Sequence, residues 1–242
     1  MTEVAEAPAG PEQVAVGAPT TEEEARQLAT QWANDQAARL TERVQQFLAS
    51  KNGHGNGNLA PRIGAPTTYE PSGKPYVPFD VLATSPIQFT GPPPYLPSKI
   101  IAVGNFAYLI AYIFTNPSVD IPAGWAVPAS VQLGGRPWRA TLDQTNLTTG
   151  TTSTQARNGV FGSPAAVYTA VPFYLPTTGP TLGGDPWLIE ANVTVYVDAP
   201  AQPFAAFATK FYDWDNDPGY PFFPPETAGY RYDLPNRYLI FS

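Results

Sequence analysis

The stretch Lys99–Thr115, KIIAVGNFAYLIAYIFT, decides the fold that we expect of this chain. It carries no charge after its first residue, and most of its side chains are β-branched, aromatic or small. Read with a period of two, its second half is apolar on both faces, which predicts a strand covered on two sides. Gly104-Asn105 lies where a two-residue hairpin turn favours positive φ. A membrane-spanning helix needs about 20 apolar residues, so we expect instead two neighbouring buried strands, 99–103 and 106–115.

The composition limits the classes of function. The chain has 242 residues, 29 of them Pro and 20 Gly, with 14% charged residues and a net charge of −7. Such an acidic chain is not expected to bind nucleic acid, because phosphate contacts need basic surface. The absence of cysteine excludes disulfides, thiolate catalysis and Cys-ligated zinc. The N-terminus has no secretory signal pattern, which leaves the cytoplasm, a virion or another export route open.

An amphipathic helix is expected over residues 20–52. Thr21 and Glu24 have the spacing of a capping box, which marks a helix N-terminus. The apolar stripe that we expect to form an interface consists of Leu28, Trp32, Leu40, Val44 and Phe47. Such a stripe either packs on its own domain or docks on another subunit.

The rest of the chain divides by composition into a tail, a linker and a β domain. Residues 1–19 are expected to be a disordered tail, and the Gly- and Pro-rich residues 53–74 a flexible linker. Residues 75–242 show short β-type segments broken by Pro and Gly, which predicts an antiparallel β-sandwich of jelly-roll or Ig-like type. Residues 187–198 alternate most clearly, whereas residues 143–162 are expected to form a long loop. Further strands are expected near 77–83, 87–90, 126–133, 138–142, 166–173, 204–212 and 237–241.

Few residues offer chemistry. His54, the one histidine, lies among glycines that cannot hold a catalytic base in place. Asp213, Asp215 and Asp217 have the spacing of a calcium loop, and calcium is the one cofactor that we consider. Pro218 departs from the EF-hand pattern, and the alternative is that these carboxylates lie in solvent at a strand end.

Aromatic side chains are dense near the C-terminus. Trp214 and Tyr220 are candidates for stacking on a sugar ring or for anchoring a protein interface. The alternative is that aromatic side chains braced by prolines, such as Phe222 and Phe223, cover the end of the β core.

Three functional hypotheses follow. The first is a non-enzymatic structural subunit that self-assembles into a filament, shell, virion or surface layer, with the helix as a docking arm. Its partner would be a second copy or another structural protein. The second is a carbohydrate-binding β-sandwich module with calcium as an additional ligand, and the third is a hydrolase that uses carboxylates alone.

Overall fold

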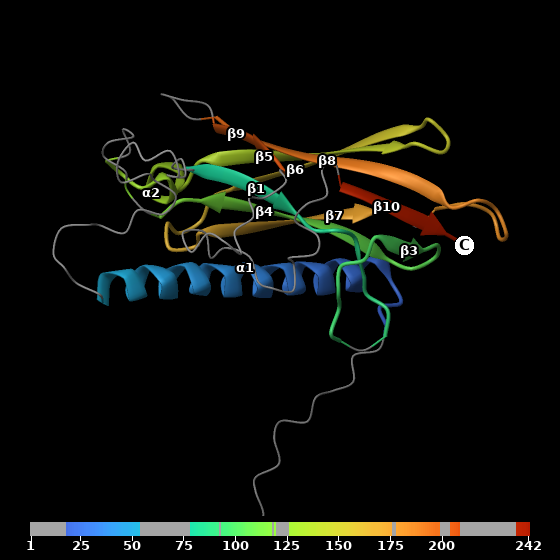
Figure 1. The fold of residues 1–242 in the computed structure, drawn as a ribbon, viewed down its shortest axis with the longest axis horizontal. Helices are drawn as coiled ribbons and strands as arrows, with labels where there is room; N and C mark the ends of the chain where they lie inside the picture. The colour runs from blue at the N-terminus through green and yellow to red at the C-terminus, as the bar shows by residue number, and fades with distance from the viewer. Residues whose placement is uncertain are drawn as a thin grey trace, which may run out of the picture.

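In the computed structural model, two β-sheets pack face to face and one long helix lies along the outer side of one of them (Figure 1). The mainly β class and the N-terminal helix are therefore confirmed. The structure describes residues 18–53, 78–91, 93–117, 119, 126–175, 178–198, 204–208 and 236–242. Almost all of the predicted tail and linker lies outside these residues, and those two predictions stay predictions.

The sheet next to the helix, here sheet A, is built around β4 (Ala107–Thr115). The strands β1 (Phe79–Ala83) and β2 (Ile87–Gln88) pair with one side of β4, and β7 (Tyr168–Leu175) pairs with the other. All nine residues of β4 are buried, because the second sheet covers one face and the helix covers the other. The sequence prediction of a strand covered on both sides is confirmed.

The second sheet, sheet B, contains six strands in the order β3-β10-β8-β5-β6, with β9 also paired to β8. All of its pairs are antiparallel except β10 with β3. Its strands are β3 (Ile100–Ala102), β5 (Pro137–Asn146), β6 (Thr152–Val160), β8 (Trp187–Val197), β9 (Phe204–Phe207) and β10 (Asn236–Phe241).

The core between the sheets is formed by alternate residues of facing strands. Val193 and Val195 of β8 and Leu109 of β4 belong to one apolar cluster. The alternation predicted for β8 is confirmed, since its odd-numbered residues from Ile189 onward are buried.

The predicted hairpin over 99–115 is wrong. The strand β3 belongs to sheet B, where it pairs with β10, while β4 belongs to sheet A. Gly104 does adopt positive φ (84°), but the turn there connects the two sheets rather than two paired strands. The reason is that β3 finds a partner about 140 residues away, which local periodicity cannot indicate.

Two further predictions are corrected. The strand expected near 126–133 is instead a short helix, α2 (Ala129–Leu133). The long loop expected over 143–162 is the hairpin of β5 and β6, because β-branched threonines favour strands. Asn146 accepts the backbone N–H groups of Thr148 and Thr149 at 2.9 and 3.1 Å, which makes the connecting turn.

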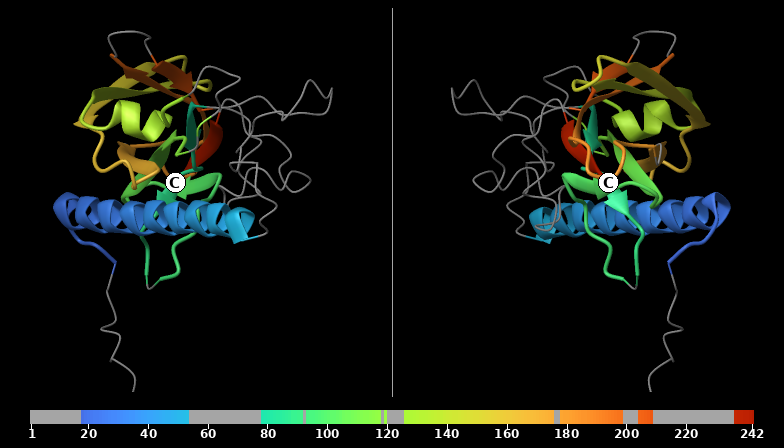
Figure 2. Two further views of the ribbon diagram at one scale, coloured as in Figure 1. Left: turned by 90° about the vertical axis from the view of Figure 1, so that its left-hand side faces the viewer. Right: turned by 90° about the vertical axis from the view of Figure 1, so that its right-hand side faces the viewer.

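The helix α1 (Glu22–Gly53) lies across sheet A, as both end views in Figure 2 show. Its predicted capping box forms: Thr21 Oγ1 accepts the Glu24 N–H, and Glu24 Oε2 accepts the Thr21 N–H, both at 3.2 Å. The centre of its buried face is a stripe of small side chains spaced by four residues: Ala25, Ala29, Ala33 and Ala37. Small side chains let the helix approach the aromatic surface of sheet A closely.

Candidate ligand-binding pocket

The residues that the sequence predicts as an interface lie on or beside the buried face of α1. Leu40 and Val44 are buried against sheet A of the same chain, and Leu28 and Trp32 are half-buried at the border of the same cluster. Phe47 is part of α1, but its side chain lies outside the described part of the structure. The packing of Leu40 and Val44 within one chain is a structural fact, while a docking role for the stripe stays a prediction.

The predicted calcium and stacking residues cannot be placed. Asp213, Asp215, Asp217, Trp214 and Tyr220 all lie in the segment 209–235, outside the described residues. Among the residues that are described, no group of three acidic or histidine side chains could hold a metal ion. The calcium hypothesis therefore stays a prediction.

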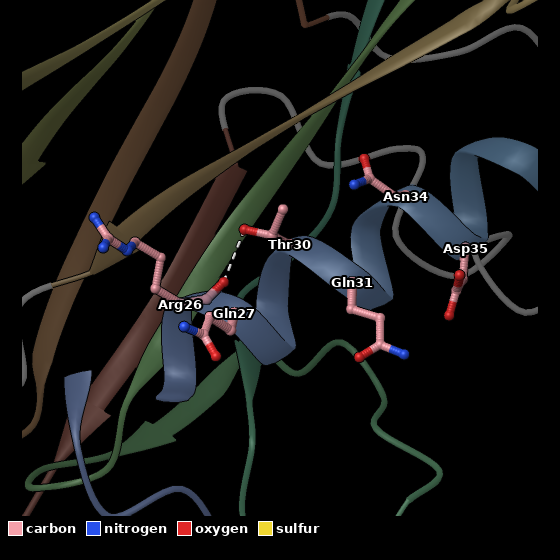
Figure 3. A pocket seen from close by; sticks show the side chains of 6 residues that line it. All are labelled: Arg26, Gln27, Thr30, Gln31, Asn34 and Asp35. Atoms are coloured by element: carbon pink, nitrogen blue, oxygen red, sulfur yellow. Dashed lines mark hydrogen bonds between the residues drawn. The ribbon is translucent and has the colours of Figure 1, made fainter. Parts of the chain in front are cut away.

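A depression on the outer face of α1 does not have the character of a site. Figure 3 shows the six side chains that line it, Arg26, Gln27, Thr30, Gln31, Asn34 and Asp35, and all of them come from the same helix. All six are exposed, and the hydrogen bond drawn among them joins Thr30 Oγ1 to the helix carbonyl of Arg26 at 2.8 Å. One convex, solvent-exposed helix surface cannot enclose a ligand.

A smaller cavity of about 200 Å³ lies at one end of the space between the sheets. The strand register of sheet B places its wall residues in rows. Gln144 of β5 opposes Ala191 of β8, and in the next inward-facing row Asn146 of β5 and Tyr238 of β10 both oppose Ile189 of β8. The residues that line the cavity are Gln144, Asn146, Thr151, Thr152, Ser153, Thr178, Trp187, Ile189, Tyr238 and Ile240.

The polar centre of this pocket is the pair Gln144 and Tyr238. Both side chains are more than nine-tenths buried, and Gln144 Nε2 donates a hydrogen bond of 2.6 Å to the Tyr238 hydroxyl. Gln144 Oε1 is buried and has no hydrogen-bond partner. Because the amide makes one side-chain bond, one of its ends stays unpaired in either orientation. An unpaired buried amide end lowers the free energy of unfolding by about 1–3 kcal/mol. A polar side chain that is kept at this position in spite of that loss calls for an explanation.

Six buried side-chain atoms in the described residues lack a partner, and they include Ser85 Oγ and Asn236 Oδ1. Among them, Gln144 Oε1 alone belongs to a residue that lines this cavity. Gln144 is therefore both a wall residue of the cavity and the holder of an unpaired amide end, although its Oε1 atom is closed to solvent in this structure.

Asn146 adds a second amide to the pocket wall. Its Oδ1 is used by the turn after β5, whereas its Nδ2 makes no hydrogen bond with the described residues. The turn itself is tied to β8, because the Leu188 N–H donates to Thr148 Oγ1 and the Leu147 N–H donates to the Leu188 carbonyl, at 2.9 and 2.8 Å. The amide is thus held on a fixed backbone.

Apolar side chains lie beside these polar groups in the pocket wall. Trp187, which is half-buried, opposes Ile240 across the β8–β10 pair, and Ile189 lies in the next row beside Tyr238. An aromatic ring beside amides and hydroxyls suits a ligand that has both apolar faces and polar groups.

The described residues that line the pocket are uncharged. None of them is acidic or basic. Burial raises the pKa of the Tyr238 phenol above its usual value, and the hydrogen bond from Gln144 opposes that rise only in part. The phenol therefore stays protonated at neutral pH. These side chains can donate and accept hydrogen bonds, but they supply no general acid or base that would work near pH 7.

The most perturbed carboxyl lies elsewhere. Burial raises the pKa of Asp80 in β1 to about 7, and the Val81 N–H, which donates to its Oδ1 at 2.7 Å, opposes the rise. Asp80 alternates with Phe79 and Val81, which face the core between the sheets, so it lies on the helix side of sheet A. It is therefore separated from the pocket by the sheet.

Sequence reasoning found part of this pocket. Trp187, Ile189 and Tyr238 were expected on strands, but Gln144 and Asn146 were assigned to a loop. The missed signal is the alternation that continues through β5, where Trp138, Ala140, Leu142, Gln144 and Asn146 all face inward.

No model of a known protein family matches its sequence, and no curated protein sequence does so at a significant level. Within the described part of the chain, neither helix has the length and hydropathy that a transmembrane helix requires.

Proposed function

We propose that this chain is a non-catalytic binding module whose pocket between the two sheets takes a small, uncharged, polyhydroxylated molecule, such as a terminal sugar residue. The observation that carries the proposal is the buried, unpaired amide end of Gln144, a residue that lines a cavity whose described wall residues are all uncharged. The body of the module is the predicted β-sandwich, and a jelly-roll or Ig-like strand order stays a prediction.

The size and chemistry of the pocket support this ligand class. Pockets for drug-sized molecules measure about 300–1,000 Å³, so the cavity of about 200 Å³ suits one sugar ring or the end of a longer glycan. A sugar hydroxyl can both donate and accept a hydrogen bond. It can therefore pair with either end of the Gln144 amide, with the Asn146 Nδ2 or with the Tyr238 hydroxyl. The ring of Trp187 provides an apolar surface for a sugar face.

Binding of neutral monosaccharides to the full chain tests the proposal. Saturation-transfer NMR and calorimetry would use glucose, galactose, mannose and N-acetylglucosamine, with galacturonate as the charged counterpart of galactose. We expect at least one neutral sugar to bind and its carboxylated counterpart to bind more weakly, because no basic group among the described wall residues compensates a buried carboxylate.

The Gln144→Leu variant gives the decisive comparison. Loss of the amide should weaken binding about tenfold or more, because a sugar hydroxyl then loses its buried partner. Gln31→Leu makes the same chemical change on the exposed face of α1 and should leave affinity unchanged. Absence of binding to every neutral sugar, or equal affinity of both variants, would overturn the proposal.

A structural subunit with α1 as its docking arm is a second proposal, supported by the half-exposed Leu28 and Trp32 at the border of the helix. If α1 docks on a second subunit, Trp32→Ala should dissociate the oligomer and leave the melting temperature unchanged. Packing within one chain predicts the reverse: a lower melting temperature with the same mass in light scattering.

A further inference from the structure

We propose that two copies of this chain associate edge to edge through β6, which pairs antiparallel with the β6 of the second copy and continues sheet B across a two-fold axis. This inference does not depend on ligand binding, although Thr152 and Ser153 of β6 also line the pocket. It rests on the length, the hydrogen-bonding direction and the sequence of this edge strand.

The strand β6 ends sheet B. It pairs with β5 along all nine of its residues, and no other strand in the described part of the chain pairs with its outer edge. Figure 1 shows β5 and β6 as the long hairpin on the side of the molecule away from α1. An open edge of this length is a template for another strand.

Two backbone hydrogen bonds show which groups of β6 face outward. The Asn146 N–H donates to the Thr151 carbonyl at 2.8 Å, and the Phe161 N–H donates to the Arg136 carbonyl at 3.0 Å. Both bonds show that odd-numbered residues of this strand direct their backbone groups toward β5. The even-numbered residues, which direct theirs to the free edge, are Thr152, Thr154, Ala156, Asn158 and Val160.

This edge has little of the usual protection against pairing, although the Arg157 guanidinium covers its Ala156 carbonyl at 3.1 Å. Proteins protect edge strands by making them short or by placing Lys, Pro or a bulge on them. The strands β2, β3 and β9 have two to four residues, and β7 contains Pro172. By contrast, β6 has neither Lys nor Pro, and its one charged side chain, Arg157, lies over the Phe173 ring of its own chain at 5.8 Å.

The sequence of β6 is complementary to itself. The antiparallel register that uses all nine residues is centred on Ala156, a small side chain that meets its own copy at the two-fold axis. In this register Gln155 opposes Arg157, and Thr154 opposes Asn158, so no like charges face each other. Thr152 opposes Val160, which is 61% exposed in the single chain and would be covered in the pair.

One existing contact must change on pairing. The Arg157 guanidinium donates to the Ala156 carbonyl at 3.1 Å, and this carbonyl would accept the Ala156 N–H of the second copy instead. The released guanidinium then lies opposite the Gln155 amide oxygen of the second copy. The hydrogen bond lost within one chain is thus replaced between chains.

Sedimentation velocity and light scattering of the full chain over a wide concentration range test the inference. We expect a reversible dimer of twice 26.0 kDa. Ala156→Lys places two ammonium groups opposite each other at the two-fold axis and should weaken the dimer at least tenfold, because like charges directly opposite destabilise strand pairs. Thr141→Lys adds the same charge to the same sheet face on β5, next to Ala156, and should not affect association.

A mixture of two variants with opposite charges at position 156 distinguishes a loss of edge pairing from a folding defect. An equal mixture of the Ala156→Lys and Ala156→Glu variants should form a mixed dimer, although each variant alone stays monomeric. A wild-type chain that is monomeric at all concentrations would overturn the inference. So would a dimer that Ala156→Lys leaves intact, or one that Thr141→Lys dissociates equally.

Discussion

Replacement of the buried polar pair Gln144 and Tyr238 by apolar groups should separate binding from folding. The variant combines Gln144→Leu with Tyr238→Phe. It removes one hydrogen bond of 2.6 Å, whose net contribution to the free energy of unfolding is about 1 kcal/mol. It also removes the unpaired Gln144 amide oxygen, whose burial costs about 1–3 kcal/mol.

The balance predicts a double variant that is as stable as the wild type or up to about 2 kcal/mol more stable. For a chain of this length, 1 kcal/mol corresponds to a change of about 2–4 °C in melting temperature. Tyr238→Phe alone should instead destabilise the protein by about 1–3 kcal/mol, because it leaves the whole Gln144 amide buried without a partner. The two substitutions should therefore be strongly non-additive.

Urea unfolding of the wild type, both single variants and the double variant measures these free energies. The sugar that binds the wild type should raise the melting temperature of the wild type but not of the double variant, because a ligand stabilises only the folded state that binds it. A double variant that is several kcal/mol less stable than the wild type would refute the reasoning. In that case the pair supports the fold, and its unpaired oxygen is not evidence of a ligand.

Three other perturbations test the remaining features. Burial raises the pKa of Asp80 from its ordinary value of 3.8 to about 7 in the folded state. The folded state therefore holds more protons between these values, and its free energy of unfolding should fall as pH rises from 4 to 7. Asp80→Asn should remove that part of the pH dependence in urea titrations at several pH values; identical slopes in both proteins would contradict it. Ala33→Leu should destabilise the protein by about 1–3 kcal/mol, because Ala33 is fully buried between α1 and sheet A; an unchanged melting temperature would show that α1 does not pack there. If the three aspartates bind calcium, millimolar calcium should raise the melting temperature, and Asp215→Asn should abolish the rise.

Local sequence patterns predicted the elements in which each face keeps the same surroundings, core or solvent, from one end to the other. The strand β4 was predictable because both of its faces are apolar, and β8 because its two faces differ at every step. The start of α1 was predictable because the side chains of Thr21 and Glu24 each accept the other residue's backbone N–H, which has no partner within the helix. Each of these signals acts between residues that are close in sequence.

Only the tertiary structure decided which strands pair and which face of the helix is buried. Residues 99–103 had the pattern of a hairpin partner for β4, yet β3 pairs with β10 across most of the chain. The alanines on the buried face of the helix are covered more completely than Trp32 at its border. Their small side chains let the helix backbone come close to the sheet, and close packing gains dispersion contacts.

The pocket depends on the same long-range pairing. In the sequence, Gln144 and Asn146 are polar residues among threonines and read as a loop. They become pocket residues because β8 pairs with both β5 and β10, which places Gln144 and Tyr238 on the inner face of the same sheet. Periodicity reports which face a side chain takes, but the partner it meets on that face is determined by strand order, which the sequence encodes only through contacts between distant residues.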